Sequence, residues 1–118
     1  MNGMPAMTEA NRGNVVLIRY QRTGQEKPWL RPALVLSSQA YQQGRDELLL
    51  AAITSSPVLP QPGDTAVQRW SDAGLLGPSL VTGVLFTTLP TSVERVLGTL
   101  TDVEMRGVED NLRRNLVL

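Results

Sequence analysis

Short apolar runs, separated by clusters of glycine, proline and polar residues, follow one another through most of this chain. Runs rich in β-branched or other apolar residues and bounded by such clusters are typical of strands. The pattern predicts six strands, over residues 13–20, 31–37, 47–54, 65–70, 79–86 and 93–100. It also predicts loops over residues 21–30, 38–46 and 58–64, and a turn over residues 72–78.

Three of these predictions depend on single features. The run 47–54 would also suit a helix, but it is short and prolines follow it, which favours a strand. Gly83, inside the fifth run, is compatible with a β-bulge. The sixth run is either a strand throughout or a short helical turn followed by a strand, because Pro90 interrupts the chain just before it.

The C-terminal residues have helical spacing instead. Thr101, followed three residues later by Glu104, forms a capping box at the start of a helix. We expect its apolar stripe to pack on the core, with a dimer or partner surface as the second choice. The stripe consists of Met105, Val108, Leu112 and Leu116. Short strands closed by one terminal helix predict a mainly β fold, a small antiparallel barrel or curled sheet.

Length and composition restrict the number of domains and the kinds of functional site that the chain can form. The 118 residues suit a single domain over residues 13–118, after a disordered lead-in over residues 1–12. The chain has no cysteine and no histidine, which excludes disulfides, thiolate sites, a histidine base and the common zinc sites. We therefore expect no metal and no cofactor. No apolar run reaches the length of a membrane span, so we expect no membrane contact and a cytoplasmic location.

The charge is unevenly distributed although its net value is zero. Residues 12–45 carry six basic side chains and one acid, whereas residues 46–118 carry five basic side chains and nine acids. Ten of the eleven cations are arginine, which suits bidentate contacts with phosphate. The first third of the chain could therefore form a phosphate-binding face. An unevenly charged, solvated surface is the alternative.

A loop meets a buried strand at Arg31. Pro32 fixes its own φ and favours an extended Arg31, and the apolar residues of the run 33–36 suit a strand buried on both faces. The guanidinium is thus held where a loop joins the core, either to face a ligand or only to anchor the strand end.

Three more candidates accompany this arginine. Glu26 lies on the preceding loop, and Thr54 and Ser55 end the strand that should pair with 31–37. A carboxylate base, an arginine that holds phosphorane charge and a hydroxyl that positions phosphate fit RNA cleavage by 2′-OH transesterification. Each signal is weak when taken singly, because a loop glutamate or a strand-end threonine is commonly only solvated.

The order of the motifs is more specific than any one of them. It consists of GNVVLI (13–18), GQE (24–26), RPALVLS (31–37), AAITS (51–55), GLLGPS (74–79) and LGTLT (97–101). From residue 13 to the C-terminus the chain resembles the MazF/PemK family of toxin endoribonucleases of type II toxin–antitoxin systems. The resemblance implies an SH3-like curled β-barrel of the CcdB/PemK kind, a homodimer, sequence-specific and metal-independent cleavage of single-stranded mRNA, and a cognate MazE-like antitoxin whose extended segment occupies the RNA groove.

The resemblance also implies roles for individual residues. Arg31 would stabilise the transition state, Glu26 would be the general base, and Thr54 with Ser55 would position the phosphate. Further candidates for RNA contacts are Arg19, Arg22, Lys27, Trp29, Arg45 and Arg69. Trp29 and Tyr41 could stack on unpaired bases, although Trp29 could equally anchor its loop.

The sequence departs from the family pattern in two places. Pro28 and Trp29 stiffen and enlarge the loop before Arg31, so the cleavage motif or RNA access could differ. The run 83–87 lacks the basic residue that many members carry in this strand. Two other functions stay open: a toxin of the same fold that poisons DNA gyrase, as CcdB proteins do, and an inactive SH3-like binding module.

Overall fold

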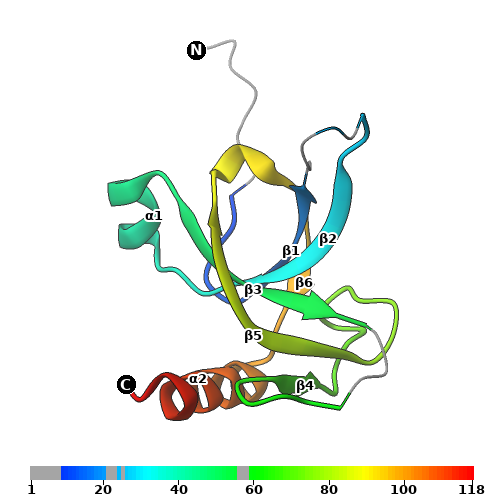
Figure 1. Cartoon of the computed structure of the whole chain (residues 1–118), viewed down its shortest axis with the longest axis vertical. Helices are drawn as coiled ribbons and strands as arrows, with labels where there is room; N and C mark the ends of the chain where they lie inside the picture. Colours follow the sequence, from blue (N-terminus) through cyan, green and yellow to red (C-terminus); the bar gives the residue numbers. More distant parts are fainter. Residues whose placement is uncertain (1–8, 21–23, 25, 56–58) are drawn as a thin grey trace.

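The computed structural model describes residues 9–20, 24, 26–55 and 59–118. A strongly curled antiparallel sheet of six strands has the order β4-β5-β3-β2-β1-β6 (Figure 1). Its elements in chain order are β1 (Asn14–Tyr20), β2 (Trp29–Val35), α1 (Gln39–Arg45), β3 (Leu48–Thr54), β4 (Thr65–Val67), β5 (Ser79–Thr88), η1 (Pro90–Ser92), β6 (Val93–Thr99) and α2 (Asp102–Leu116). The predicted fold class, a mainly β curled barrel with a C-terminal helix, is confirmed.

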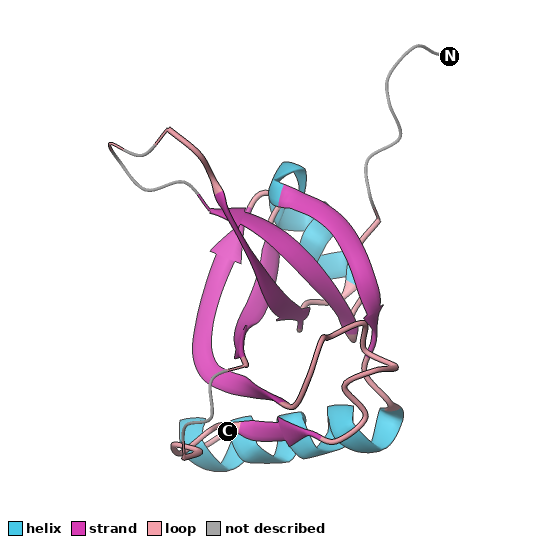
Figure 2. Cartoon of the chain, turned by 90° about the vertical axis from the view of Figure 1, so that its right-hand side faces the viewer, coloured by secondary structure: helices cyan, strands magenta, loops and turns pink. Residues whose placement is uncertain are grey.

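The sheet separates two apolar clusters, and β2 contributes to both. Leu34 belongs to the cluster that includes Val108 of α2, whereas Ala33 and Val35 belong to the cluster on the opposite face. All three β2 residues are fully buried, as predicted for a strand covered on both sides. Figure 2 shows α2 lying across one end of the curled sheet, next to β4.

Helix α2 begins as the capping box predicts. The amide of Glu104 donates to the hydroxyl of Thr101, and that hydroxyl donates to Oε1 of Glu104 (both 3.2 Å). Met105, Val108 and Leu112 pack on the core, which confirms most of the predicted stripe. Leu116 is exposed, however, because it lies on the last helical turn, past the residues that contact the core.

The predicted loop 38–46 is wrong, because it contains helix α1. The hydroxyl of Ser38 accepts a hydrogen bond from the amide of Tyr41, and Asp46 ends the helix in the left-handed conformation. None of the residues of α1 is buried. The helix therefore has no apolar stripe from which it could be predicted.

Other element boundaries also move. β2 begins at Trp29, before the predicted residue 31, because Trp29 and Leu30 pair with Tyr20 and Arg19 in the β1–β2 hairpin. It ends at Val35, because the amides of residues 36 and 37 both donate to the carbonyl of residue 49. β5 continues to Thr88, two residues beyond the prediction, and a helical turn, η1, precedes β6, as one of the two alternatives predicted.

β4 ends at Val67 instead of residue 70 because of α2. The amides of Gln68 and Arg69 both donate to Oε2 of Glu104, at 2.7 and 3.1 Å. The carboxylate at the start of α2 thereby occupies the two amides that a longer β4 would have used for strand pairing.

The predicted lead-in is partly ordered. Residues 1–8 lie outside the described residues, but Ala10 is buried in the second cluster. Arg12 donates to the carbonyl of Leu36 and forms an ion pair with Glu109 of α2. In the described part of the chain, no helix is long and apolar enough to cross a membrane.

Replacing Gly107 with alanine should stabilise the protein. Gly107 lies inside α2, and an added Cβ would meet only Cγ2 of Thr65, at an ordinary contact distance of 3.6 Å. Alanine loses less backbone entropy than glycine on entering a helix, so we expect the free energy of unfolding to rise by about 0.5–1 kcal/mol in urea titrations. The matched control is Gly98→Ala on β6, whose Cβ would lie 2.5 Å from the backbone of Ala73 and should destabilise the fold. A destabilised Gly107→Ala protein would contradict the packing described for α2.

Candidate active site

The pairing of β2 with β3 brings the two principal candidates together. Ala33 pairs with Ala52, and Val35 pairs with Leu50. Continued by two residues, this register would set Arg31, the third residue of β2, opposite Thr54, the last residue of β3. Because alternate residues of a strand face the same side, both side chains lie on the face of Ala33 and Ala52.

Both residues line one open cleft of about 410 Å³. Its walls are the start of β2 and the end of β3: Trp29, Leu30, Arg31, Pro32, Ile53, Thr54 and Ser55. The side chain of Arg31 is exposed and forms no ion pair with the carboxylates of the described residues. The cleft therefore offers a cation and hydroxyl groups to an anionic ligand.

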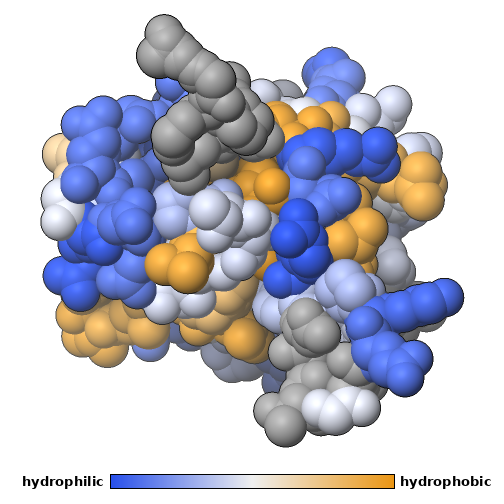
Figure 3. All heavy atoms as spheres, turned by 90° about the horizontal axis from the view of Figure 1, so that it is seen from above, coloured by the Kyte–Doolittle hydropathy of each residue, from blue (hydrophilic) through white to orange (hydrophobic). Residues whose placement is uncertain are grey.

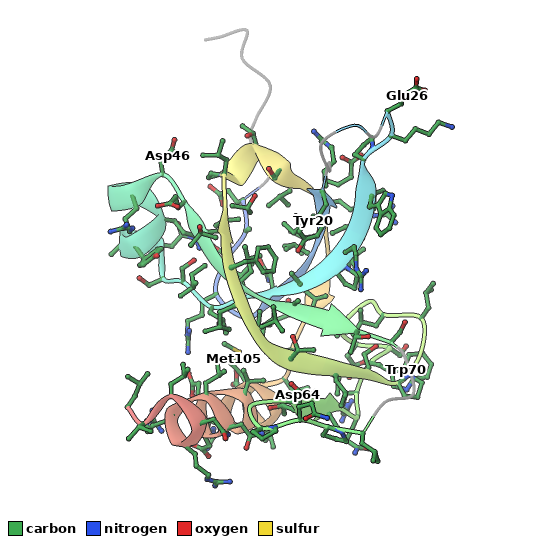
Figure 4. The ribbon with its side chains drawn as sticks, in the orientation of Figure 1. Tyr20, Glu26, Asp46, Asp64, Trp70 and Met105 are labelled. Carbon is green, nitrogen blue, oxygen red and sulfur yellow. The ribbon has the colours of Figure 1, made fainter. Side chains whose placement is uncertain are left out.

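The loop residues among the candidates lie differently. Glu26 is exposed at the tip of the β1–β2 loop, points away from the body of the molecule in Figure 4, and does not line the cleft. Lys27 is exposed beside it, and Trp29 is 44% exposed at the edge of the cleft. Arg22 lies outside the described residues.

Three other arginines that were predicted to contact RNA form ion pairs within the protein. Arg19 is paired with Glu94 at 2.7 Å, Arg45 with Glu47 at 3.5 Å, and Arg69 with Asp72 at 2.8 Å. These pairs are exposed, so each is weak and could exchange its carboxylate for a phosphate.

Tyr41 also has a partner within the protein. The guanidinium of Arg45 lies over its ring, with 5.4 Å between the guanidinium carbon and the ring centroid. A base that stacked on this face of Tyr41 would have to displace Arg45.

Tyr20, which is not among the predicted site residues, lies close enough to Arg31 for the two to interact electrostatically. It ends β1 opposite Trp29, and its half-buried ring lies 5.6 Å from the ring of Phe86, centroid to centroid. Burial raises the pKa of the Tyr20 phenol, and the positive charge of Arg31 opposes that shift. The alternation of Ile18 and Tyr20 with Leu17 and Arg19 was the one signal that could have placed this ring on the face of Arg31.

Apolar side chains remain exposed around the cleft and elsewhere. In Figure 3 hydrophobic residues lie among hydrophilic ones on the face that is turned to the viewer. The exposed large apolar residues of β2, β5 and the 59–64 loop are Trp29, Leu30, Leu59 and Val84. Among the described residues, no cluster of three or more acidic side chains could hold a metal ion.

A family model described as the PemK-like, MazF-like toxin of type II toxin–antitoxin systems matches residues 11–116. This chain belongs to that family. The match covers β1 through α2, so Arg31 and Thr54 both lie inside the family domain. No curated protein sequence matches the chain significantly.

Solved structures share the fold at low identity. An endoribonuclease from a mycobacterial species, solved with its cognate antitoxin, is 18% identical with a TM-score of 0.72, over 93% of this chain and 97% of the other. A MazE–MazF structure from Deinococcus radiodurans is 21% identical with a TM-score of 0.75, over 92% and 96%. The Mycobacterium tuberculosis toxin MazF-mt6 is 20% identical with a TM-score of 0.67, over 87% and 97%. These likenesses establish the fold of this PemK/MazF-like toxin.

Replacing Tyr20 with phenylalanine should change how stability depends on pH. The folded protein keeps this phenol protonated above its usual pKa of 10.0, where the unfolded chain has already released the proton. The stability that comes from burying the neutral phenol is therefore complete below that pH and is lost as pH rises through the raised, folded-state pKa. We expect the difference in unfolding free energy between the wild type and Tyr20→Phe to be constant from about pH 7 to about pH 9, and to shift in favour of the variant at higher pH. Urea titrations across this range measure it, and a difference independent of pH throughout would contradict the burial of Tyr20.

Proposed function

We propose that this toxin is an endoribonuclease that cleaves single-stranded RNA by transesterification at the Arg31–Thr54 cleft. The observation that carries the proposal is the position of these two residues in one cleft, with Arg31 exposed and without an ion pair to a described carboxylate. Membership of the PemK/MazF-like family supports it, as do structural neighbours that are named endoribonucleases. The reaction needs a held phosphate and two proton transfers, which protein groups can supply without a metal.

Three residues of the cleft, Arg31, Thr54 and Ser55, would act directly on the phosphate in this reaction. The 2′-oxygen attacks the adjacent phosphorus, its proton passes to a base, and the bond from phosphorus to the 5′-oxygen breaks with protonation of the leaving group. Arg31 would bind the non-bridging oxygens, whose charge grows in the transition state. The hydroxyls of Thr54 and Ser55 would hold the same phosphate in place. The products are a 2′,3′-cyclic phosphate and a 5′-hydroxyl end.

Glu26 is the proposed general base. None of the described residues that line the cleft is a carboxylate, so a base of this kind has to come from outside it. Glu26 lies on the loop that leads directly into β2, five residues before Arg31. We infer that this carboxylate accepts the proton of the 2′-hydroxyl in the complex with RNA.

The substrate and partners follow from the same surface. An open cleft with Trp29 at its edge suits unpaired bases, which can stack on an aromatic ring. Lys27, Arg19, Arg45 and Arg69, which are exposed, would contact the RNA backbone. We also propose that the protein forms a homodimer and is neutralised by a MazE-like antitoxin. Neighbours solved with an antitoxin, and the apolar residues exposed around the cleft, support this proposal.

Arg31→Ala should abolish most RNA cleavage. Removal of one group that stabilises transition-state charge costs roughly a hundredfold to a thousandfold in rate. The measurement is cleavage of a long single-stranded RNA by purified protein in EDTA, with mapping of the cut sites and their ends. We expect wild-type cuts at a recurring short motif that leave 5′-hydroxyl ends.

The matched control is Arg114→Ala, which removes an equal charge from the exposed end of α2 and should cut at the wild-type rate. Equal activity in the Arg31 and Arg114 variants would contradict the role of Arg31. RNA left intact by a wild-type protein that still arrests growth would contradict the nuclease and favour a protein-poisoning toxin.

Glu26→Gln tests the general base. Glutamine cannot take the proton, so the variant should lose roughly a hundredfold or more in cleavage rate. Single-turnover rates on one RNA substrate measure this loss. Asp110→Asn, an equivalent change on the exposed face of α2, serves as the control. A Glu26→Gln enzyme with the wild-type rate would exclude Glu26 as the base.

A further inference from the structure

The end of β3 that carries Thr54 is bordered by a bulge in β5. Between Ala51 and Ile53 the chain of β3 advances two residues, whereas β5 goes from Leu85 to Val81, four residues. The extra length lies opposite Ala52, around Gly83. The predicted bulge at Gly83 is therefore confirmed. It lies opposite Ala52, which is two residues before Thr54 on β3.

Side-chain groups replace the backbone ladder at this bulge. The hydroxyl of Thr82 donates to the carbonyl of Ala52 at 2.7 Å and accepts from the amide of Val84 at 3.2 Å. The amide of Gly83 turns away from β3 and donates to Oδ1 of Asp64 at 2.9 Å. The conformation of the bulge thus depends on a carboxylate that lies outside the sheet ladder.

Asp64 is itself held on two sides. Its Oδ2 accepts from the amide of Gln61 at 2.8 Å, and its own amide donates to the carbonyl of Gln61 at 2.9 Å. The side-chain amide of Asn111, on α2, donates to the carbonyl of Asp64 at 3.2 Å and to the hydroxyl of Thr65 at 2.7 Å. Figure 4 shows Asp64 between β5 and α2.

The backbone of the 61–64 turn and the backbone of the β5 bulge approach each other too closely for a side chain at either glycine. A Cβ on Gly63 would lie 3.3 Å from Cα of Gly83, and Gly63 has a φ of +96°, which favours glycine. The 61–64 turn and the bulge therefore fit against each other, with Asp64 bonding both.

This arrangement borders the cleft that holds Thr54. A second, mostly apolar cavity of about 500 Å³ adjoins the first, and Thr54 lines both. Its other walls come from the turn and the bulge: Leu59, Gln61, Pro62, Asp64, Thr82, Gly83 and Val84. A change in the bulge would therefore move the wall beside Thr54.

We propose that Asp64 is a positioning residue: its carboxylate holds the β5 bulge, and through Thr82 and Ala52 it fixes the end of β3 that presents Thr54 to the RNA phosphate. Its kinetic consequence rests on the proposed function. A misplacement of about 1 Å at a reacting group can cost up to a hundredfold in rate, so the effect belongs in the chemical step more than in RNA binding.

The experiment compares Asp64→Ala with Asn111→Ala in the full-length protein. Asn111→Ala removes two hydrogen bonds from the same turn but leaves the carboxylate and the bulge intact. We expect both variants to lower the melting temperature. In Asp64→Ala alone, the amide NMR signals of Gly83 and of residues 52–55 should shift, and kcat for RNA cleavage should fall roughly tenfold to a hundredfold, with KM changed by less than about twofold.

Asp64→Asn covers the case in which the alanine variant does not fold. It keeps one acceptor for the amide of Gly83, so it should recover part of the lost kcat and of the wild-type signals. Unchanged signals at residues 52–55 in both Asp64 variants would overturn the proposal, as would a kcat, corrected for folded protein, equal to that of Asn111→Ala. If the wild type cuts no RNA, the proposed function fails, and the NMR comparison still decides whether Asp64 positions Thr54.

Discussion

The antiparallel register between β2 and β3 is the constraint on which the site depends. It is fixed by residues that have no freedom to slip: Ala33, Leu34 and Val35 are fully buried, and they pair with equally apolar partners on β3. A shift by one residue would turn each of these side chains to the other face of the sheet. Burial of the core therefore fixes the register of the two strands, whose continuations bring Arg31 and Thr54 to one cleft.

Arg31 differs in its electrostatic surroundings from three other arginines that were candidates for RNA contacts. Arg19, Arg45 and Arg69 each lie near a carboxylate, whereas the guanidinium of Arg31 faces an open cleft and half-buried Tyr20. A cation without a carboxylate partner keeps its full attraction for a phosphate, while a paired one first has to exchange partners. Its position in the cleft thus distinguishes Arg31 from these three arginines, which composition alone treats as equivalent to it.

The strands and the capping box could be predicted because they depend on local pattern, and the expected pairing of β2 with β3 is also present. The carboxylate partner of Arg19 could not be predicted, since Glu94 is 75 residues away in the sequence. α1 was missed because it buries nothing, and β4 was predicted too long because Glu104, far along the chain, takes two of its amides. The end of β4 is therefore set by a tertiary contact that overrides local propensity.

A double-mutant cycle on Arg31 and Thr54 tests the central claim most directly. Cleavage of one RNA substrate is measured for the wild type, Arg31→Ala, Thr54→Ala and the double variant. If the register makes the two residues act on one phosphate, the double variant should be little slower than Arg31→Ala alone, with a coupling energy of at least about 1 kcal/mol. Losses that simply add, with a coupling energy within about 0.3 kcal/mol of zero, would contradict the account.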